Sequence, residues 1–496
     1  MILARLLPLV LSFARDRRRW LLAGAPTPRS AAFHQRRAIA LVRAIAKLGP
    51  SFVKLAQVFA ARADLVPEPY LSTLGTLADQ VPAVPFDQVA ATLLAAYGEP
   101  ADALFEQLER TPIAAASLGQ VHRARYRGEE VVVKVLRPGV EGLVAADLRI
   151  AERLLRVVAR RWSNRHVLAL QAVVSEFGTR IWEEMDFRSE ARYAHEIRCN
   201  FAGRAGVIVP RVVPEMTRQR VLVLEYVEGR RIDAIDSWIA EGRVQPRALV
   251  STVMELYLQM MLVDGLFHAD PHPGNLLVAP DGRLVLLDFG MVVRVPRATR
   301  RHLVQTVFAA IRQDVKLLVE GFQQLEIVPA NADLAPVREL AARLLTLART
   351  HATTHERLER LLADEVMATL YDAPVTLPSD MVYFARTASL IEGLGTRYDP
   401  YFNAIDFAAP IAIRMRGRIM ASLAGRAQPV RNDWPAVLGG ILGEVAGVVT
   451  RAGRDIAAIF GMRLLGVSAG AAASRGNAGR LPARDPDAPL ALPAAS

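Results

Sequence analysis

Apolar residues recur every three or four positions through residues 35–80 and again, with many charges between them, through residues 145–203. This spacing places the apolar side chains on one face of a helix, so both regions are predicted to be helical. From about residue 110 the spacing of apolar residues changes to that of strands. Arg123–Lys134 is therefore predicted to form two strands. Val221–Tyr226 predicts a further, buried strand.

After Gly229 the pattern is almost entirely helical, apart from two short strand-like pieces at Leu276–Val278 and Leu284–Leu287. A small β-rich part joined by a short connector to a larger helical part is the outline of a protein kinase. The pattern therefore predicts the α+β class, as a two-lobed protein-kinase-like fold with an N-terminal helical extension and a helical C-terminal region.

The predicted domain organisation has five parts. They are a basic and helical extension (residues 1–105), a β-rich N-lobe (106–228), a helical C-lobe (229–420), amphipathic helices (421–465) and a disordered tail (466–496). The tail is predicted to be disordered because its Ala, Gly, Pro and Arg residues have little apolar surface to bury. The amphipathic region carries an apolar stripe interrupted by charges, which predicts a membrane-adjacent or self-associating helix and would allow a homodimer.

The chain has 496 residues, of which 52% are hydrophobic and 22% charged, and this composition is that of a globular protein. Its one cysteine, Cys199, excludes an intramolecular disulfide and a cysteine-rich zinc site. The longest run without Asp, Glu, Lys or Arg is the twelve residues Thr111–His122. Since a helix needs ~20 apolar residues to cross a bilayer, no transmembrane segment is predicted.

Positive charge is concentrated at the N-terminus. The formal net charge is +11, and residues 1–50 contribute +9 of it, from ten basic side chains and the single acid Asp16. A basic segment next to an apolar stretch is attracted to anionic lipid, so we expect an anionic membrane surface as a partner. The remaining residues are nearly neutral and lack interleaved basic and aromatic residues, so no nucleic-acid partner is expected.

The stretch His268–Asn275 is followed, after the second strand-like piece, by Asp288–Gly290. Transfer of a phosphoryl group from a nucleotide needs one carboxylate that orients the acceptor and oxygen ligands for magnesium. An Asp with an Asn five residues later, and then an Asp-Phe-Gly, supplies these groups at the spacing of kinase catalytic loops. Asp270 is therefore predicted to be the catalytic acid, Asn275 and Asp288 the metal ligands, and ATP and Mg²⁺ the cofactors.

A kinase also needs a strand lysine that contacts the phosphates and a helical glutamate that orients the lysine. Lys134 follows three valines in a predicted strand, where an unpaired ammonium would be costly, and is the predicted lysine. Glu190 is the best candidate for its catalytic partner. The alternative is that Glu190, in a helix rich in acids, belongs to a solvated face.

No glycine-rich phosphate loop precedes the lysine strand. Its place is taken by an alanine run that ends in a serine, and the alternative is that this run begins a helix. Backbone N–H groups of such a loop can still face phosphates, but alanines do not enter the positive-φ conformations of glycine, so the loop should be stiffer. The predicted nucleotide-binding residues are Ala114, Ala115, Ala116, Ser117, Lys134, Glu225 and Val227.

Together these motifs closely resemble the UbiB (AarF) family of atypical kinase-like proteins, a group linked to ubiquinone biosynthesis. The resemblance runs from about Leu48 to Asn403. The matching segments are the Ala-rich loop Ala114–Ala124, the lysine strand Val131–Gly139, the acidic motif Glu184–Asp186, the catalytic stretch Phe267–Asn275 and the late segment Glu392–Pro400.

The resemblance also implies a lid over the active site. The family's N-terminal KxGQ motif reads here as Lys54, Leu55, Ala56 and Gln57. In the family this helix crosses the active site, its Lys and Gln reach in, and the Lys pairs with the acids that match Glu184 and Asp186. Ala56 replaces the family's glycine, which favours the helix by up to ~1 kcal/mol but adds a methyl group that the lid must accommodate.

A lid in the cleft leaves little room for a protein substrate, so ATP hydrolysis or phosphorylation of a small lipid-like acceptor is expected. By resemblance, the process is ubiquinone or other isoprenoid-lipid biosynthesis, with a lipid or quinone precursor as ligand, on the cytoplasmic side of the inner membrane. Two alternatives remain open. One is a small-molecule kinase of the aminoglycoside-phosphotransferase type, which lacks the lid helix and the Ala-rich loop, and the other is a nucleotide-gated scaffold without net phosphoryl transfer.

Overall fold

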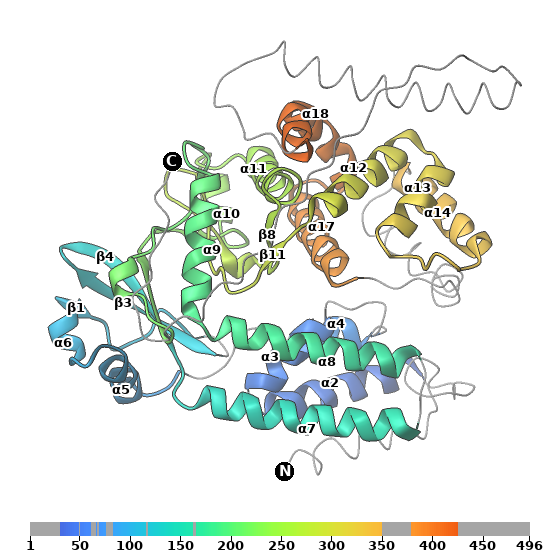
Figure 1. Ribbon diagram of the computed structural model, residues 1–496. Helices are drawn as coiled ribbons and strands as arrows, with labels where there is room; N and C mark the ends of the chain where they lie inside the picture. Colours follow the sequence, from blue (N-terminus) through green and yellow to red (C-terminus); the bar gives the residue numbers. More distant parts are fainter. Residues whose placement is uncertain are drawn as a thin grey trace, which may run out of the picture. The chain divides into compact units, whose positions relative to one another are not determined.

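The computed structural model describes residues 30–48, 50–60, 66, 69–75, 83–115, 118–161, 165–349 and 378–424. It combines many helices with a sheet-containing N-lobe (Figure 1), so the predicted α+β class is confirmed. The predicted nucleotide-binding residues Ala116 and Ser117 lie outside the described residues. The same holds for the basic residues 1–29, the amphipathic region beyond residue 424 and the tail.

The chain divides into two compact units. The first contains Met1–Ile411 with Pro489–Ser496, and the second contains Ala412–Ala488. All described site residues belong to the first unit, and helix α18 (Ala404–Leu423) crosses the boundary. In the described part of the chain, no helix is both long and apolar enough to cross a membrane.

The N-lobe is built on an antiparallel sheet in the order β1-β3-β4-β6, with β2 paired to β3. Its strands are β1 (Gln107–Leu108), β2 (Ala114–Ala115), β3 (Gly119–Tyr126), β4 (Glu129–Leu136) and β6 (Val221–Glu225). The strands predicted within Arg123–Lys134 and Val221–Tyr226 are thus confirmed. Val131, Val133 and Val135 are at most 1% exposed in the core under α5 (Phe86–Tyr97), and the alternation of a strand turns Lys134 to the opposite face.

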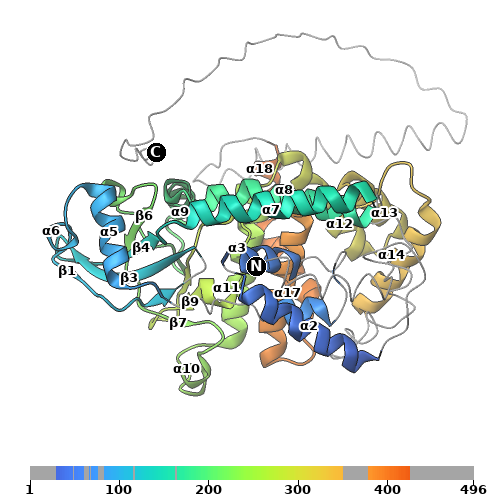
Figure 2. The same cartoon turned by 90° about the horizontal axis from the view of Figure 1, so that it is seen from below.

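Three helices connect β4 to β6, namely α7 (Val140–Arg161), α8 (Arg165–Glu184) and α9 (Phe187–Asn200). They confirm the helical prediction for residues 145–203. Helices α7 and α8 lie side by side as an antiparallel pair in both views (Figures 1 and 2), and α9 packs against β6. Asp186 ends the turn between α8 and α9, because its side chain accepts a hydrogen bond from the backbone N–H of Arg188 at 3.1 Å and caps α9.

The N-terminal extension is helical, as predicted, with α2 (Ala31–Ala46), α3 (Pro50–Ala60) and α4 (Tyr70–Gly75). Pro50 opens α3, a position where the missing N–H of proline breaks no helical hydrogen bond. The extension shares its apolar core with α8 and also touches α7 through α3. The buried members of this core are Ala38, Val53, Ala56, Val66, Tyr70, Leu74 and Val173.

The C-lobe contains more strands than the sequence pattern predicted. Besides the expected β9 (Leu276–Val278) and β10 (Leu284–Leu286), the region has β7 (Arg230–Arg231), β8 (Leu266–His268) and β11 (Val292–Arg294). The prediction of only two short strand-like pieces after Gly229 is therefore wrong, whereas the mainly helical character is confirmed for the described residues. These extra strands have only two or three residues, and a period of two residues cannot stand out over such a length.

The short strands hold the loops that carry the predicted chemistry. One sheet has the order β5-β10-β9-β7, with β5 at Val207–Ile208, and β8 pairs with β11 in a second sheet. Asp270 follows β8, Asn275 precedes β9, and Asp288 lies between β10 and β11. The three side chains are therefore anchored by strand pairing at both ends of each loop.

The described part of the C-lobe also contains helices. They are α10 (Asp236–Ala240), α11 (Pro246–Leu258), α12 (Arg297–Arg312), α13 (Val315–Gln324), α14 (Leu334–Arg349) and α17 (Ser379–Tyr398), and the N-lobe adds the one-turn helix α6 (Ala101–Leu104). A π-helix over Gln259–Asp264 continues α11 directly into β8. Helix α17 packs along α11, which brings a late segment of the chain to the catalytic loop.

Candidate active site

Lys134 lies at the centre of a partly buried ion-pair cluster. Its Nζ donates to Oε1 and Oε2 of Glu190 at 2.7 and 2.9 Å, and to Oδ1 of Asp288 at 3.2 Å. Strand β4 supplies the lysine, helix α9 the glutamate and the loop after β10 the aspartate. The fold thus joins three residues that the sequence analysis assigned to one site.

Burial and charge act in opposite directions on this cluster. Burial would lower the pKa of Lys134, but the carboxylates of Asp288 and Glu190 outweigh it and raise that pKa. Burial raises the pKa of Glu190, which is only 2% exposed, to about 7, although the ammonium of Lys134 acts against this rise. Lys134 is therefore charged at neutral pH, and the carboxyl group of Glu190 gains or loses its proton near neutral pH.

Asp288 has a left-handed backbone conformation with φ +56°, which is uncommon for a residue with a side chain. Its Oδ1 accepts a hydrogen bond from the backbone N–H of Gly290 at 3.1 Å while it also contacts Lys134. Burial would raise the pKa of Asp288, but Lys134 and Lys54 outweigh it and hold that pKa well below its usual range. Asp288 is therefore a fixed negative charge.

The carboxylate of Asp270 is held by two side chains. Nδ2 of Asn275 donates to the backbone oxygen of Asp270 at 3.1 Å and to its Oδ2 at 3.2 Å. Nη2 of Arg386, on α17, donates to Oδ1 of Asp270 at 3.2 Å. Burial would raise the pKa of Asp270, but Lys54 and Arg386 outweigh it and lower that pKa. Both carboxylate oxygens of the predicted catalytic acid are thus engaged.

The sequence analysis missed Arg386. It lies 116 positions after Asp270, and no local motif connects the two residues. The one available signal was that Arg386 shares helix α17 with most of the late matching segment Glu392–Pro400, which indicated that this helix belongs to the site.

The predicted lid helix reaches the neighbourhood of this cluster through Lys54. Nζ of Lys54, on α3, is 2.7 Å from Oε1 of Glu184 at the end of α8. Burial would lower the pKa of Lys54, but Glu184, Asp270 and Asp288 outweigh it and raise that pKa. Lys54 therefore faces the same carboxylates that the catalytic loops present.

The predicted lid residue Asp186 is placed differently from the expectation. Asp186 does not join Lys54 and Glu184; its Oδ1 and Oδ2 instead accept hydrogen bonds from Nε and Nη2 of Arg188 at 2.9 and 3.0 Å. The expected pairing of Lys54 with both acids is therefore wrong for Asp186, which is used to cap α9. Gln57 lies on α3, but its side chain is outside the described part of the structure.

Ala114 and Ala115 form strand β2, paired with Val121 and Gln120 of β3, so the alanine run does not begin a helix there. Strand β3 begins at Gly119. A methyl group added at Gly119 would lie 2.8 Å from the carbonyl oxygen of Val135, which shows how closely the two strands meet at this point.

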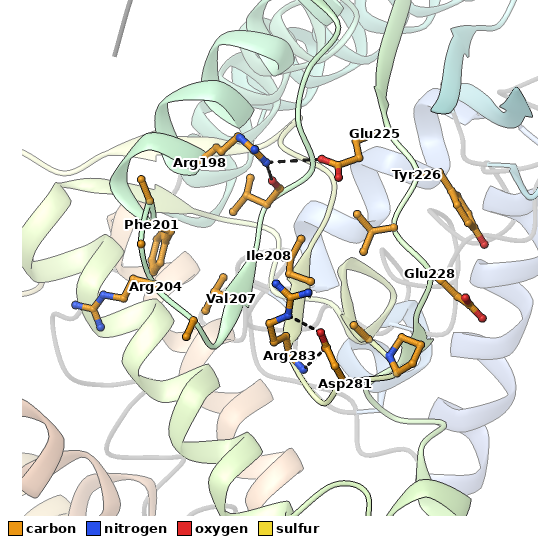
Figure 3. Close-up of a pocket in the computed structure, with 17 residues that line it drawn as sticks. Arg198, Phe201, Arg204, Val207, Ile208, Glu225, Tyr226, Glu228, Asp281 and Arg283 are labelled. Carbon is orange, nitrogen blue, oxygen red and sulfur yellow. Dashed lines mark hydrogen bonds and ion pairs between the residues drawn. The ribbon is translucent and has the colours of Figure 1, made fainter. Parts of the chain in front are cut away.

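The side chain of Glu225 contacts residues outside the Lys134 cluster. Its Oε2 accepts a hydrogen bond from the backbone N–H of Arg211 at 3.0 Å. The same Oε2 lies 3.7 Å from Nη1 of Arg198 (Figure 3). Both Glu225 and Val227 line a pocket of about 940 Å³. The pocket lies between the end of α9, the connector at residues 228–229 and the β9–β10 turn, and none of the residues of the Lys134 cluster lines it. The carboxylate of Glu225 is therefore occupied by its contacts with Arg198 and Arg211. The backbone of Glu225 is the part that could contact a nucleotide.

The donor set suits magnesium rather than a transition metal. The amide nitrogen of Asn275 is used on Asp270, which leaves its Oδ1 as an acceptor, and Asp288 is kept ionised. Oxygen ligands of this kind are those that Mg²⁺ takes, and phosphates usually complete its shell. Among the described residues, no group of three or more His, Cys, Asp or Glu side chains could hold a metal ion alone.

Comparison with known proteins gives a consistent result. A family model described as the ABC1 atypical kinase-like domain matches residues 76–322. The uncharacterised protein sll1770 of Synechocystis sp. is 32% identical over 441 residues, which cover 86% of this chain and 75% of that protein. The chloroplastic protein ACTIVITY OF BC1 COMPLEX KINASE 7 of Arabidopsis thaliana is 32% identical over 402 residues, which cover 80% of this chain but only 57% of that protein.

Among solved structures, the complex of Rv3197 with erythromycin from Mycobacterium tuberculosis is similar, with a TM-score of 0.53 and 24% sequence identity. The match covers 80% of this chain and 98% of that one. At this identity the likeness concerns the fold, and it agrees with the predicted kinase-like architecture.

Proposed function

This chain belongs to the UbiB/AarF family of ABC1 atypical kinase-like proteins, and from that premise we propose that it binds ATP with magnesium and either hydrolyses it or transfers its terminal phosphoryl group. The observation that carries the proposal is the contact of Lys134 with both Glu190 and Asp288. A charged lysine held between a helical glutamate and a metal-binding aspartate is the arrangement that kinases use to bind phosphates.

Each side chain then has a defined task. Lys134 contacts the phosphates, and Glu190 holds the lysine in place through two hydrogen bonds. Asp270 is ionised because its pKa is lowered, so it can accept a hydrogen bond from an incoming hydroxyl group or water. Magnesium, held by Asn275 and Asp288, would offset the negative charge of the phosphates.

The surroundings of Asp270 favour a small acceptor. Lys54 lies close enough to influence the pKa of Asp270, and Arg386 already donates to one of its carboxylate oxygens. A folded protein substrate would have to displace both cations, whereas water or one hydroxyl group of a lipid-like molecule needs less space. We therefore extend the proposal to ATP hydrolysis, or phosphorylation of a lipid or quinone precursor, in ubiquinone or other isoprenoid-lipid biosynthesis at the cytoplasmic face of the inner membrane.

The test is ATP consumption by the full chain with magnesium, measured with and without anionic vesicles and a quinone-precursor analogue. We expect magnesium-dependent consumption that these additions increase, and labelled phosphate on the lipid fraction if an acceptor is phosphorylated. In the variant Asp270→Asn, turnover should fall by at least about tenfold while ATP binding persists. Equal turnover in the parent and this variant would contradict the role of Asp270.

A nucleotide-gated scaffold is a second candidate, because one observation favours it. Arg386 contacts Oδ1 of Asp270, an oxygen that an acceptor would need, and Lys54 is paired with Glu184 near Asp270. A site with both cations in place could bind a nucleotide and respond to it with little turnover. ATP binding that changes the protease sensitivity of α3, without measurable ATP consumption, would support this candidate over the first.

A further inference from the structure

Helix α7 buries one face and leaves an apolar line beside it in solvent. The buried face packs on α8 and α3. Leu143, Ile150 and Val157 are 41%, 37% and 59% exposed. These residues are seven positions apart, so they follow one another at steps of about 10 Å along the same side of the helix. Single exposed apolar residues are ordinary on protein surfaces, but a regular line along one helix is not.

A row of arginines accompanies this line. Four exposed arginines follow at Arg149, Arg153, Arg156 and Arg160. Because a helix turns by about 100° per residue, they share the flank next to the apolar line. In the part of the chain that the structure describes, none of the four has an ion-pair or hydrogen-bond partner. The nearby acids are Glu152, which is exposed, and Glu141, which pairs with Arg220 at 2.7 Å.

The geometry of the face indicates what covers it. The line lies on the outer side of a single convex helix and consists of aliphatic side chains, without the aromatic anchor that protein interfaces favour. A second copy of the chain would bring two rows of arginines together, which like-charge repulsion opposes. A lipid bilayer accepts a convex helix of this type, because aliphatic side chains enter the acyl boundary while arginines reach the lipid phosphates.

We propose that the outer face of α7, formed by Leu143, Ile150, Val157 and the four arginines, is a docking surface for an anionic lipid bilayer. This inference rests on the membrane part of the proposed function and is independent of the nucleotide chemistry. Since α3 also packs against α7, docking would bring the Lys54 lid close to the lipid surface.

The test is sedimentation of the full chain with phosphatidylglycerol–phosphatidylcholine vesicles at low and high salt. We expect the parent to bind, with weaker binding at high salt because its cations are screened. The double variant Ile150→Glu with Val157→Glu should lower the partition coefficient by about tenfold, since it removes apolar contact and adds repulsion from the anionic surface. Both positions are exposed, so the fold should tolerate the change, and a thermal melt checks this.

The matched control is the pair Val307→Glu with Phe308→Glu on α12, two residues that are 48% and 56% exposed. This variant adds the same charge away from α7 and should bind like the parent. Equal sedimentation of the parent and of the α7 double variant would overturn the docking surface alone and leave residues 1–50 as the membrane contact. A parent that fails to bind anionic vesicles at all would also overturn the membrane part of the proposed function.

Discussion

Lys54 and Glu184 form an ion pair, with 2.7 Å between Nζ and Oε1, that ties the N-terminal extension to the end of α8. The side chains are 15% and 19% exposed, so water screens the pair only partly. The same lysine also lies within the electrostatic reach of Asp270 and Asp288. The ion pair therefore holds Lys54 beside the carboxylates of the loops that the proposal assigns to nucleotide binding.

Removing this charge should open the site. In Lys54→Met, we expect the association rate of ATP to rise by about threefold or more, because the lid loses its partner at Glu184 and opens more readily. Stopped-flow measurements with a fluorescent ATP analogue would detect the change. The control is Lys316→Met, on the exposed face of α13, which should not alter the rate. A slower rate in Lys54→Met would indicate that this lysine recruits the nucleotide.

Arg386 should restrain turnover. In Arg386→Met, Oδ1 of Asp270 is released for water or an acceptor, and we expect ATP consumption to rise by about three- to tenfold. Arg397→Met is the matched control, because Arg397 is on the same helix and pairs with the exposed Asp236 at 2.6 Å, outside the Lys134 cluster. A loss of turnover in Arg386→Met, with unchanged ATP affinity, would show instead that Arg386 positions Asp270 for the reaction.

Glu190 should make nucleotide binding depend on pH near neutrality. Burial raises the pKa of Glu190 to about 7. When the pH falls from 8 to 6, this carboxyl gains a proton and no longer offsets the charge of Lys134 or accepts both of its hydrogen bonds. The affinity for magnesium–ATP should therefore fall by up to about tenfold over this range.

The variant Glu190→Gln separates this effect from the titration of ATP itself. Its affinity should be low throughout and should follow only the protonation of the nucleotide. Calorimetric titrations of both proteins at several pH values provide the comparison. Parallel pH profiles in the two proteins would remove Glu190 as the titrating group.

Ala56 should stabilise the lid helix through two separate effects. Its methyl group is buried, with 4% of the residue exposed, in the core shared by α3, α4 and α8. Ala56→Gly should lower the free energy of unfolding by about 2 kcal/mol, from helix propensity and lost apolar burial. Ala40→Gly, at an exposed position of α2, loses only the propensity and should cost about 1 kcal/mol. If denaturant unfolding gave the same decrease in the free energy of unfolding for both variants, the methyl group of Ala56 would make no packing contacts.

Residues in strong local patterns of the sequence lie together in the structure. Lys134 follows a run of valines whose alternate burial is visible in the pattern, and Asp270, Asn275 and Asp288 stand at fixed spacings in one segment. The resemblance also implied that Lys54 meets Glu184, which the structure contains. Such contacts can be predicted because each residue belongs to a motif with a known partner.

The remaining contacts depend on the packing of distant elements. Arg386 reaches Asp270 because α17 lies along α11, and nothing in the local sequence encodes that packing. The direction of the Glu225 side chain is set by Arg198 and by the backbone of Arg211, residues of other elements. The side chain of Asp186 could pair with Lys54 of the lid helix or cap α9. It caps α9, because it accepts a hydrogen bond from the backbone N–H of Arg188.

The most direct test of the nucleotide site is the magnesium–ATP response of Asp288→Asn. Asparagine tolerates the left-handed backbone of this position, so the variant removes charge with little change in shape. The control is Asp102→Asn, which removes an exposed carboxylate from α6. In a thermal-shift titration we expect the parent and Asp102→Asn to be stabilised by magnesium–ATP, and Asp288→Asn to require at least about tenfold more nucleotide for the same shift. The same response in Asp288→Asn and the parent would contradict the assignment of this loop to magnesium and nucleotide binding.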